Sequence, residues 1–502
     1  MLVALASGLV IESAAALPWA GVSLPLRGPC SDCYMKQCEY AFSKGTNPCH
    51  TCIKTHKEDL SRPPCQLHGN CYDAAMDWCS SSRSQALSPS PRPEPSPGPN
   101  PPLASPAGNR RVGDGFGVDI SIKPGFTGYG DGELELMAKA FKVLRVGIDW
   151  PVVEKDCGTY NFSLYDAIIH PLFEAGIRPY PILGYTNKCY EDSKYNCDNE
   201  KCIEAYANFS EATAQHYKQY SGLNISFSCV NEPNNPTFGG ASPKGNAKLA
   251  KAGGSAFLGM GFGYSGGVMA GVDTDYAKDL IDQGILKHVT ALSTHPYTHH
   301  APEFKLESLQ KIRSLMDQAG GKEIKLRLDE WAYPYDGFPS SFDEAASFVP
   351  RMWMACLAFG LNCDLGIFFN WDGVQDKLKP NALYDASATF QTTVGNAYSF
   401  DKLANVDGAA YAAGFFDQHG KSFFVWPRNG PTGNLLHSKG ESLFVRSGQK
   451  RQVSVDSGER SACWAVTEYN GQVMDKVCSD SNGVVTLDVR LGIYLTSQSR
   501  LA

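Results

Sequence analysis

The sequence lacks an excess of positive charge. Its 502 residues include 45 Lys and Arg against 52 Asp and Glu, which gives a net charge of −7 and a pI near 5.9. Proteins that bind phosphate backbones or anionic lipid carry the opposite balance, because cations must neutralise the phosphates. The composition therefore predicts that nucleic acid is not a partner.

The chain also has little that resembles a transmembrane segment. Residues 252–272 carry no charge over 21 positions, which is long enough to cross a bilayer. Eight of these positions are Gly, however, and Ser and Tyr interrupt the rest, so the apolar density is low. We expect a buried strand at 256–260 followed by a Gly-rich loop, and no membrane span.

Cysteine, in contrast, is abundant. Eight of the 17 cysteines lie between Cys30 and Cys79, and this compact, even-numbered cluster indicates disulfides formed in an oxidising compartment. The spacing of the cysteines at 30, 33, 49 and 52 also matches a zinc ribbon. Export favours disulfides over zinc, and three N-glycosylation sequons indicate export: Asn161-Phe-Ser, Asn208-Phe-Ser and Asn224-Ile-Ser.

Two further cysteine predictions concern the rest of the chain. Cys463 and Cys478 lie in runs typical of a hairpin, so we expect a disulfide that closes a loop of about 15 residues. Because 17 is odd, at least one thiol is free unless chains pair. Cys229 is the candidate, since it lies within a predicted strand where a small buried side chain packs well.

Composition divides the chain into five parts. Residues 81–109 form a linker, since 81–108 hold nine Pro and seven Ser and favour extended polyproline II. Before the linker we expect a signal-like leader at 1–27 and a cysteine-rich module at 28–80. After it we expect a (β/α)8 barrel at 110–396 and a small β-sandwich at 397–502, where short strand patterns replace helical ones.

The barrel prediction rests on eight apolar runs separated by helical patterns. Eight strand–helix repeats over about 290 residues fit a (β/α)8 barrel in number and length. The alternative is an open doubly wound sheet, but no Gly-x-Gly-x-x-Gly turn follows the first run. The predicted strands begin near residues 115, 141, 177, 225, 256, 289, 324 and 365.

Polar and aromatic residues gather where the predicted strands end. The fourth run ends in Val230-Asn-Glu232-Pro, and the seventh ends in Leu328-Asp-Glu330-Trp. The active sites of (β/α)8 barrels lie at the C-terminal ends of the strands, so these two glutamates should meet. Four other candidates end the second, sixth and eighth runs: Arg145, His295, Tyr297 and Trp371.

This constellation resembles glycoside hydrolase clan A, the retaining glycosidases built on (β/α)8 barrels. Family thirty-nine is the most similar, through Arg145-Val-Gly-Ile-Asp-Trp-Pro-Val-Val-Glu154 and Gly158-Thr-Tyr-Asn-Phe-Ser-Leu-Tyr-Asp166. Family five is the second candidate, although its members usually place His at the end of strand three, where this chain has Tyr185.

The resemblance implies a role for each matched residue. Glu232 would be the general acid/base, with a raised pKa, and Glu330 the ionised nucleophile. Asn231 would hydrogen-bond the sugar 2-hydroxyl, and a sugar ring would stack on Trp371. Tyr297 would orient Glu330, Arg145 would keep Glu330 charged, and His295 would shape the wall of the site beside Tyr297.

The resulting hypothesis is a secreted retaining hydrolase of β-glycosidic bonds in a polysaccharide or glycan, located outside the cell or in a wall. The alternative is a non-catalytic carbohydrate-binding or wall-structural glycoprotein on a decayed barrel. The cysteine-rich module would bind carbohydrate or wall material. No cofactor is expected, and no metal, since Pro296 breaks the helical spacing of His295, His299 and His300.

Overall fold

The computed structural model describes most of the chain beyond residue 110. The described residues are 111–122, 126–190, 197, 199–238, 241–298, 301–333, 342–404, 406, 410–428 and 450–497. The predicted leader, cysteine-rich module and linker lie outside these residues, as do His299 and His300.

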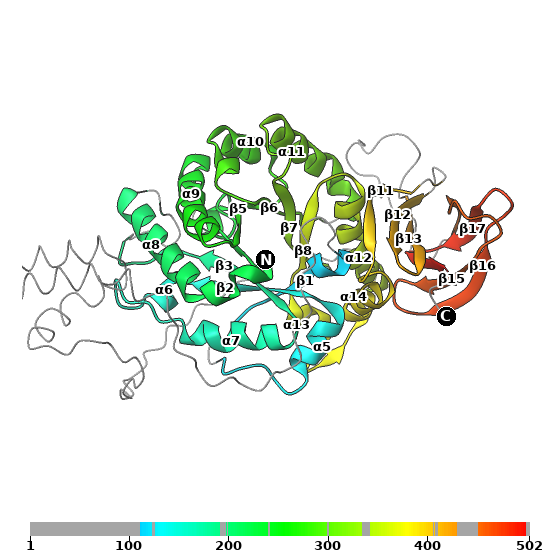
Figure 1. Ribbon diagram of the computed structural model, residues 1–502, viewed down its shortest axis with the longest axis horizontal. Helices are drawn as coiled ribbons and strands as arrows, with labels where there is room; N and C mark the ends of the chain where they lie inside the picture. Colours follow the sequence, from blue (N-terminus) through cyan, green and yellow to red (C-terminus); the bar gives the residue numbers. More distant parts are fainter. Residues whose placement is uncertain are drawn as a thin grey trace, which may run out of the picture. The chain divides into compact units, whose positions relative to one another are not determined.

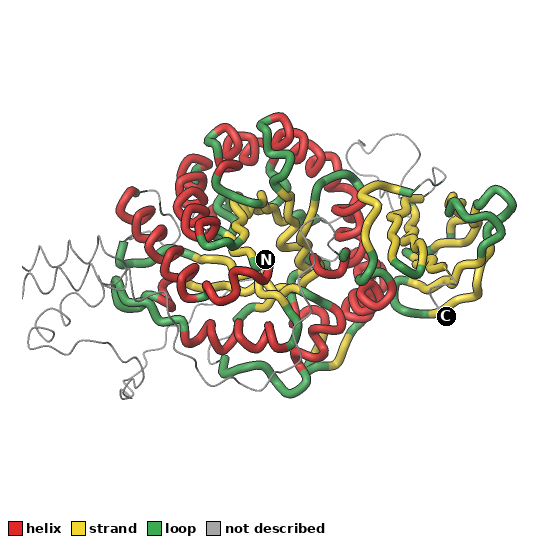
Figure 2. Tube along the Cα trace, viewed as in Figure 1, coloured by secondary structure: helices red, strands yellow, loops and turns green. Residues whose placement is uncertain are grey.

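Eight parallel strands form a closed barrel, with each strand paired to the next and β8 paired to β1. Figure 1 shows this ring, and Figure 2 shows the helices around it. The predicted (β/α)8 fold is confirmed, and the open doubly wound sheet is excluded. The strands are β1 (Phe116–Ile120), β2 (Val143–Asp149), β3 (Arg178–Gly184), β4 (Ser226–Ser228), β5 (Gly263–Ala270), β6 (Ala291–His295), β7 (Lys325–Trp331) and β8 (Cys363–Phe368).

The helices bury one face against the barrel, as their sequence patterns predict. On α11, the residues at three- and four-residue spacing, Leu306, Leu309, Ile312 and Met316, are all buried. The α-helices are α5 (Glu133–Ala140), α6 (Trp150–Val153), α7 (Ser163–Glu174), α8 (Glu200–His216), α9 (Pro243–Gly259), α10 (Thr274–Asp282), α11 (Leu306–Gln318), α12 (Phe342–Ala358), α13 (Trp371–Val374) and α14 (Ala382–Thr393). Short 3-10 helices are η2 (Val112–Gly115), η3 (Lys218–Leu223), η4 (Pro236–Phe238), η5 (Ile285–Lys287) and η6 (Pro302–Lys305).

The fifth strand differs from the prediction. The expected strand at 256–260 falls largely within the end of α9, where Phe257 is fully buried, and β5 occupies the stretch expected to be a Gly-rich loop. Glycine is needed in β5 because neighbouring atoms approach so closely. A Cβ at Gly266 would lie 2.9 Å from the side chain of Val289. Close packing therefore overrides the weak strand propensity of glycine.

A β-sandwich follows the barrel, as predicted. Its six-stranded sheet has the order β11-β12-β13-β18-β15-β16, and a two-stranded sheet pairs β14 with β17. Buried residues of both sheets, including Val425, Val455 and Val485, form one apolar core. The strands are β11 (Tyr398–Leu403), β12 (Ala410–Asp417), β13 (Gly420–Pro427), β14 (Arg451–Asp456), β15 (Cys463–Glu468), β16 (Val473–Cys478), β17 (Val484–Val489) and β18 (Ile493–Ser497), while β9 (Gln375–Asp376) pairs with β10 (Lys379–Pro380) beside the barrel.

The described cysteines form four disulfides. The predicted Cys463–Cys478 bond joins β15 to β16, and the others are Cys157–Cys189, Cys197–Cys202 and Cys356–Cys363. Cys229 is the free cysteine of the described chain, as predicted, and it is fully buried. Within the described chain, no helix is both long and apolar enough to span a bilayer.

Candidate active site

The two predicted glutamates face each other at the C-terminal ends of β4 and β7. Glu232 follows β4 by four residues, and Glu330 lies near the end of β7. Glu232 adopts a left-handed backbone conformation (φ 42°), which is uncommon outside glycine, and its N–H donates to the carbonyl of Val268 at 2.9 Å. Such a conformation often marks a functional residue that the surrounding structure holds in place.

Glu330 is held by a cation and a phenol. The Arg145 guanidinium donates from Nη1 to Oε2 at 2.7 Å, and the Tyr297 hydroxyl donates to Oε1 at 2.7 Å. Arg145 also donates from Nη1 to Asp119 at 2.6 Å and from Nη2 to Asn231 at 2.7 Å. These contacts hold both oxygens of Glu330 in place.

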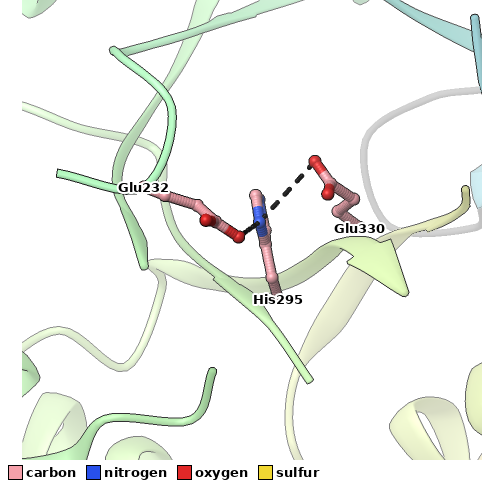
Figure 3. Close-up of side chains that lie close together, drawn as sticks. All are labelled: Glu232, His295 and Glu330. Carbon is pink, nitrogen blue, oxygen red and sulfur yellow. Dashed lines mark hydrogen bonds and ion pairs between the residues drawn. The ribbon is translucent and has the colours of Figure 1, made fainter. Parts of the chain in front are cut away.

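Glu232 has a different set of partners. Its Oε1 lies 2.8 Å from Nδ1 of His295, and its Oε2 accepts from the Asn235 amide at 2.8 Å. Figure 3 shows the imidazole between the two glutamates, with Nδ1 also 3.6 Å from Oε2 of Glu330. On the other side of the ring, Nε2 lies 3.4 Å from Asp329, so carboxylates flank both nitrogens of His295.

This surrounding charge decides the protonation of the imidazole. Burial alone would lower the pKa of His295, but the carboxylates of Glu330, Asp329 and Glu232 raise it to about 10. The imidazole is therefore a cation at neutral pH, hydrogen-bonded through Nδ1 to Glu232 and paired by charge with Asp329. Burial alone would raise the pKa of Glu232, yet the hydrogen bond and charge of His295 bring it below its usual value. The raised pKa expected for Glu232 is not found in this structure.

The same network contains Asp119 on β1, and its pKa is also shifted. Burial raises the pKa of Asp119 to about 6, against the opposing effect of Arg145. Asp119 is 5% exposed, and it shares the Arg145 cation with Glu330. Asp119 therefore takes up a proton as the pH falls through about 6.

One oxygen or nitrogen from each of Glu232, His295 and Glu330 lies within 4.8 Å of the other two. Such a donor set has the size of a metal site. The lone pairs already accept from Tyr297, Asn235 and Arg145, and the Arg145 cation would repel a metal ion. The arrangement therefore fits an ion-pair network better than a metal centre.

The structure brings six of the seven predicted site residues into one network: Asn231, Glu232, Arg145, His295, Tyr297 and Glu330. Trp371 differs. Its ring is 1% exposed, and its indole N–H donates to Glu133 at 2.8 Å. Little of Trp371 is therefore open to a sugar in this structure, and its stacking role stays a prediction.

Three residues of the network were not predicted as site residues. Asp119 holds Arg145, Asp329 lies behind His295, and Asn235 binds Glu232. A sequence signal existed for the two aspartates, since each interrupts an apolar strand run and a charged residue there is rarely buried without a partner. Asn235 lies three residues beyond Glu232, and no pattern marks it.

We expect Arg145→Met to destabilise the fold by about 3–5 kcal/mol, because it leaves the buried Asp119 and the partly buried Glu330 without their cation. The deficit should be smaller at pH 5 than at pH 8, since the unpaired acids then have folded pKa values above their unfolded ones and lose stability as the pH rises. Urea unfolding at both pH values measures this. The exposed ion-pair variant Lys139→Met should change stability by under about 1 kcal/mol. An equal effect of both variants would show that the Arg145 network contributes little.

Comparison of the sequence with protein-family models and with curated proteins found no match. Solved structures, however, resemble it. A family 39 glycoside hydrolase from the gut symbiont Bacteroides cellulosilyticus WH2 superposes with a TM-score of 0.58 at 15% identity, covering 77% of this chain and 81% of that one. A family 30 endoxylanase from Clostridium papyrosolvens C71 gives 0.56 at 11% identity, covering 78% and 98%.

A third similar structure is a family 39 β-xylosidase from Caulobacter crescentus, with a TM-score of 0.52 at 14% identity, covering 77% of this chain and 97% of that one. Identities this low establish the fold and not the activity. At that level the predicted resemblance is confirmed: the chain has the barrel fold of the clan A glycoside hydrolases.

Proposed function

We propose that the protein is a retaining glycoside hydrolase that cleaves β-glycosidic bonds in a polysaccharide or glycan. One observation carries the proposal: Glu232 and Glu330 approach within 4.8 Å through oxygens with different partners. Retaining enzymes place two carboxyls about 5–5.5 Å apart, whereas inverting enzymes leave about 6.5–9.5 Å for a water molecule. The short separation supports double displacement.

Glu330 is the proposed nucleophile. Arg145 and Tyr297 donate to its two oxygens and orient the carboxylate for attack on the anomeric carbon. Asn231 contributes beside it. Its Oδ1 accepts from Arg145, and its Nδ2 has no partner within the described chain. That remaining donor is suited to bind the sugar 2-hydroxyl, a contact that strengthens in the transition state.

Glu232 is the proposed acid/base, and its low pKa changes how it acts. In the free protein the available proton resides on His295, whose Nδ1 lies 2.8 Å from Oε1 of Glu232. His295 passes its proton to Oε1 of Glu232 as Glu232 protonates the departing oxygen, so the pair acts as one acid and ends with neutral His295 and ionised Glu232. Once Glu330 is esterified, its negative charge is gone. That loss favours ionised Glu232, which then activates water.

Export is the second part of the proposal. Four disulfides in the described chain suit an oxidising compartment. The sequon residues Asn161, Asn208 and Asn224 are all exposed, so an oligosaccharide could be attached without unfolding. We infer an extracellular or wall location, and a carbohydrate- or wall-binding role for the cysteine-rich module at 28–80.

A panel of chromogenic β-glycosides and insoluble polysaccharides tests the activity. The proposal expects turnover of at least one substrate by the full chain and none by Glu330→Gln. The alternative, a non-catalytic carbohydrate-binding protein on the same barrel, predicts polysaccharide binding without turnover in either protein. Binding with no product over the whole panel would therefore favour that alternative.

Deletion of residues 1–108 should leave turnover of a small soluble glycoside within about twofold of the full chain, because the Pro-rich linker supplies no core. Activity on an insoluble polymer should fall if the cysteine-rich module delivers the enzyme to it. Parallel rate measurements on the soluble and insoluble substrates separate these effects. Loss of the soluble activity would show that the barrel depends on the N-terminal segment.

A further inference from the structure

Two glycines leave open space beside Arg145 at the mouth of the barrel. Arg145, Gly147 and Asp149 lie on the same face of β2, because residues two apart share a face. On the paired strand β3, Gly184 lies opposite Asp149. A Cβ at Gly184 would meet no atom within 4 Å, and one at Gly147 would meet only Oδ1 of Asp149, at 3.5 Å. The missing side chains create a recess.

Asp149 faces this recess with an unused carboxylate. It precedes α6 at the capping position, yet its side chain accepts no hydrogen bond from that helix. Its backbone N–H donates to the Tyr165 hydroxyl at 2.8 Å, and its carboxylate has no partner within the described chain. Burial raises the pKa of Asp149. The hydrogen bonds of this half-buried carboxylate are therefore available to a ligand.

An aromatic pair borders the same space. Tyr185 follows β3 directly, and its ring stacks on Phe238 of η4 with centroids 5.9 Å apart and an interplanar angle of 9°. Burial chiefly raises the pKa of Tyr185, and the charges of Arg145, Asp149 and Glu330 also act on it. Tyr185 therefore lies beside the recess, as the residue that follows Gly184 in the chain.

We propose that this recess binds the sugar on the glycone side of the scissile bond, and that Asp149 and Tyr185 determine which sugar is accepted. The inference rests on the proposed function. A carboxylate accepts hydrogen bonds from two adjacent hydroxyls, and an aromatic ring covers the apolar face of a pyranose. Glu330 and Asp119 are paired with Arg145, whereas the Asp149 carboxylate has no cation paired with it among the described residues and would repel the carboxylate of a uronic acid placed against it. The site therefore takes a neutral sugar in preference to a uronic acid.

The test compares kcat/KM for Asp149→Ala, Asp149→Asn and the exposed control Asp275→Asn. Each is assayed on aryl β-glycosides of a neutral monosaccharide, its β-linked disaccharide and the matching uronic acid. Asp149→Ala should lose about 10- to 100-fold on a neutral substrate, the effect of one or two charge-assisted hydrogen bonds. Asp149→Asn should lower the ratio of kcat/KM for the neutral sugar to kcat/KM for the uronic acid by at least about tenfold. Asp275→Asn should match the parent chain, since its side chain is 95% exposed on α10.

A second variant fills the recess without changing the charge of the site. Gly147 does not have a positive φ, so Gly147→Val is compatible with the backbone and should raise KM about tenfold or more while the melting temperature stays within a few degrees. Unchanged kcat/KM and selectivity in all Asp149 and Gly147 variants of an active enzyme would overturn the inference. No turnover by the parent chain on any substrate would instead overturn the proposed function.

Discussion

Removing Glu330 should abolish turnover, and a small anion should restore it with altered stereochemistry. Glu330→Ala cannot form a glycosyl-enzyme, so kcat should fall by roughly 10⁴- to 10⁶-fold. Azide can occupy the vacated position beside Arg145 and Tyr297, which donate to the native carboxylate. Attack from that side inverts the anomeric carbon and yields an α-glycosyl azide from a β-glycoside.

The partner variant should give the opposite product. Glu232→Ala should lower kcat/KM by roughly 10²- to 10⁴-fold on substrates with poor leaving groups, because these need a proton. With an excellent leaving group the first step should proceed and the glycosyl-enzyme should accumulate. Azide then attacks from the Glu232 side, and two inversions give a β-glycosyl azide. Product configuration is read by nuclear magnetic resonance.

The exposed Glu307→Ala on α11 serves as the matched control and should behave as the parent chain. Exchanged azide products would mean that the two roles are reversed. Normal turnover in both single variants would place the chemistry elsewhere in the barrel.

The fold could be predicted because its information is local. Seven of the eight apolar runs coincide with strands, and the helical stripe on α11 is buried as its spacing requires. The fifth strand was predicted at the wrong place because β5 needs glycine where Val289 and Leu292 pack closely against it. These two residues lie later in the chain. Sequence periodicity carries no record of such contacts.

The site, like the fold, could be predicted where the information is local and not where it depends on contacts between distant residues. Glu232 and Glu330 follow strand ends, so barrel topology alone predicts that they meet. Their protonation could not be predicted, since it depends on Asp329 lying behind His295 and on Asp119 sharing Arg145. The burial of Trp371 could not be predicted either, because it involves residues far away in the sequence, such as Glu133, to which the indole N–H donates.

The position of the proton leads to a pH prediction for His295. Because the pKa of His295 is raised to about 10, the His295–Glu232 pair retains its proton through neutral pH and loses it only as the pH rises through that value. We therefore expect kcat/KM on a poor leaving group to decline only in the alkaline range. In His295→Gln, Glu232 must hold the proton alone. Burial without the imidazolium should raise the pKa of Glu232 above its usual 4.5, but not as far as the value of about 10 that His295 has in the parent chain. The alkaline decline should then move to lower pH by several units.

The size of the effect depends on pH, which separates titration from misfolding. At pH 8 the deficit of His295→Gln should exceed about 100-fold, while at pH 5 it should be under about tenfold, since each unit of pH changes the protonated fraction tenfold. The exposed control His419→Gln should keep the parent profile. Melting temperatures measured in the same buffers account for stability, because a raised folded pKa stabilises below pH 6.5 and that contribution disappears as the pH passes about 10. If the pH profiles of the parent chain and His295→Gln coincide while both proteins stay folded, the proton does not reside on His295. Glu232 must then take it directly from solvent.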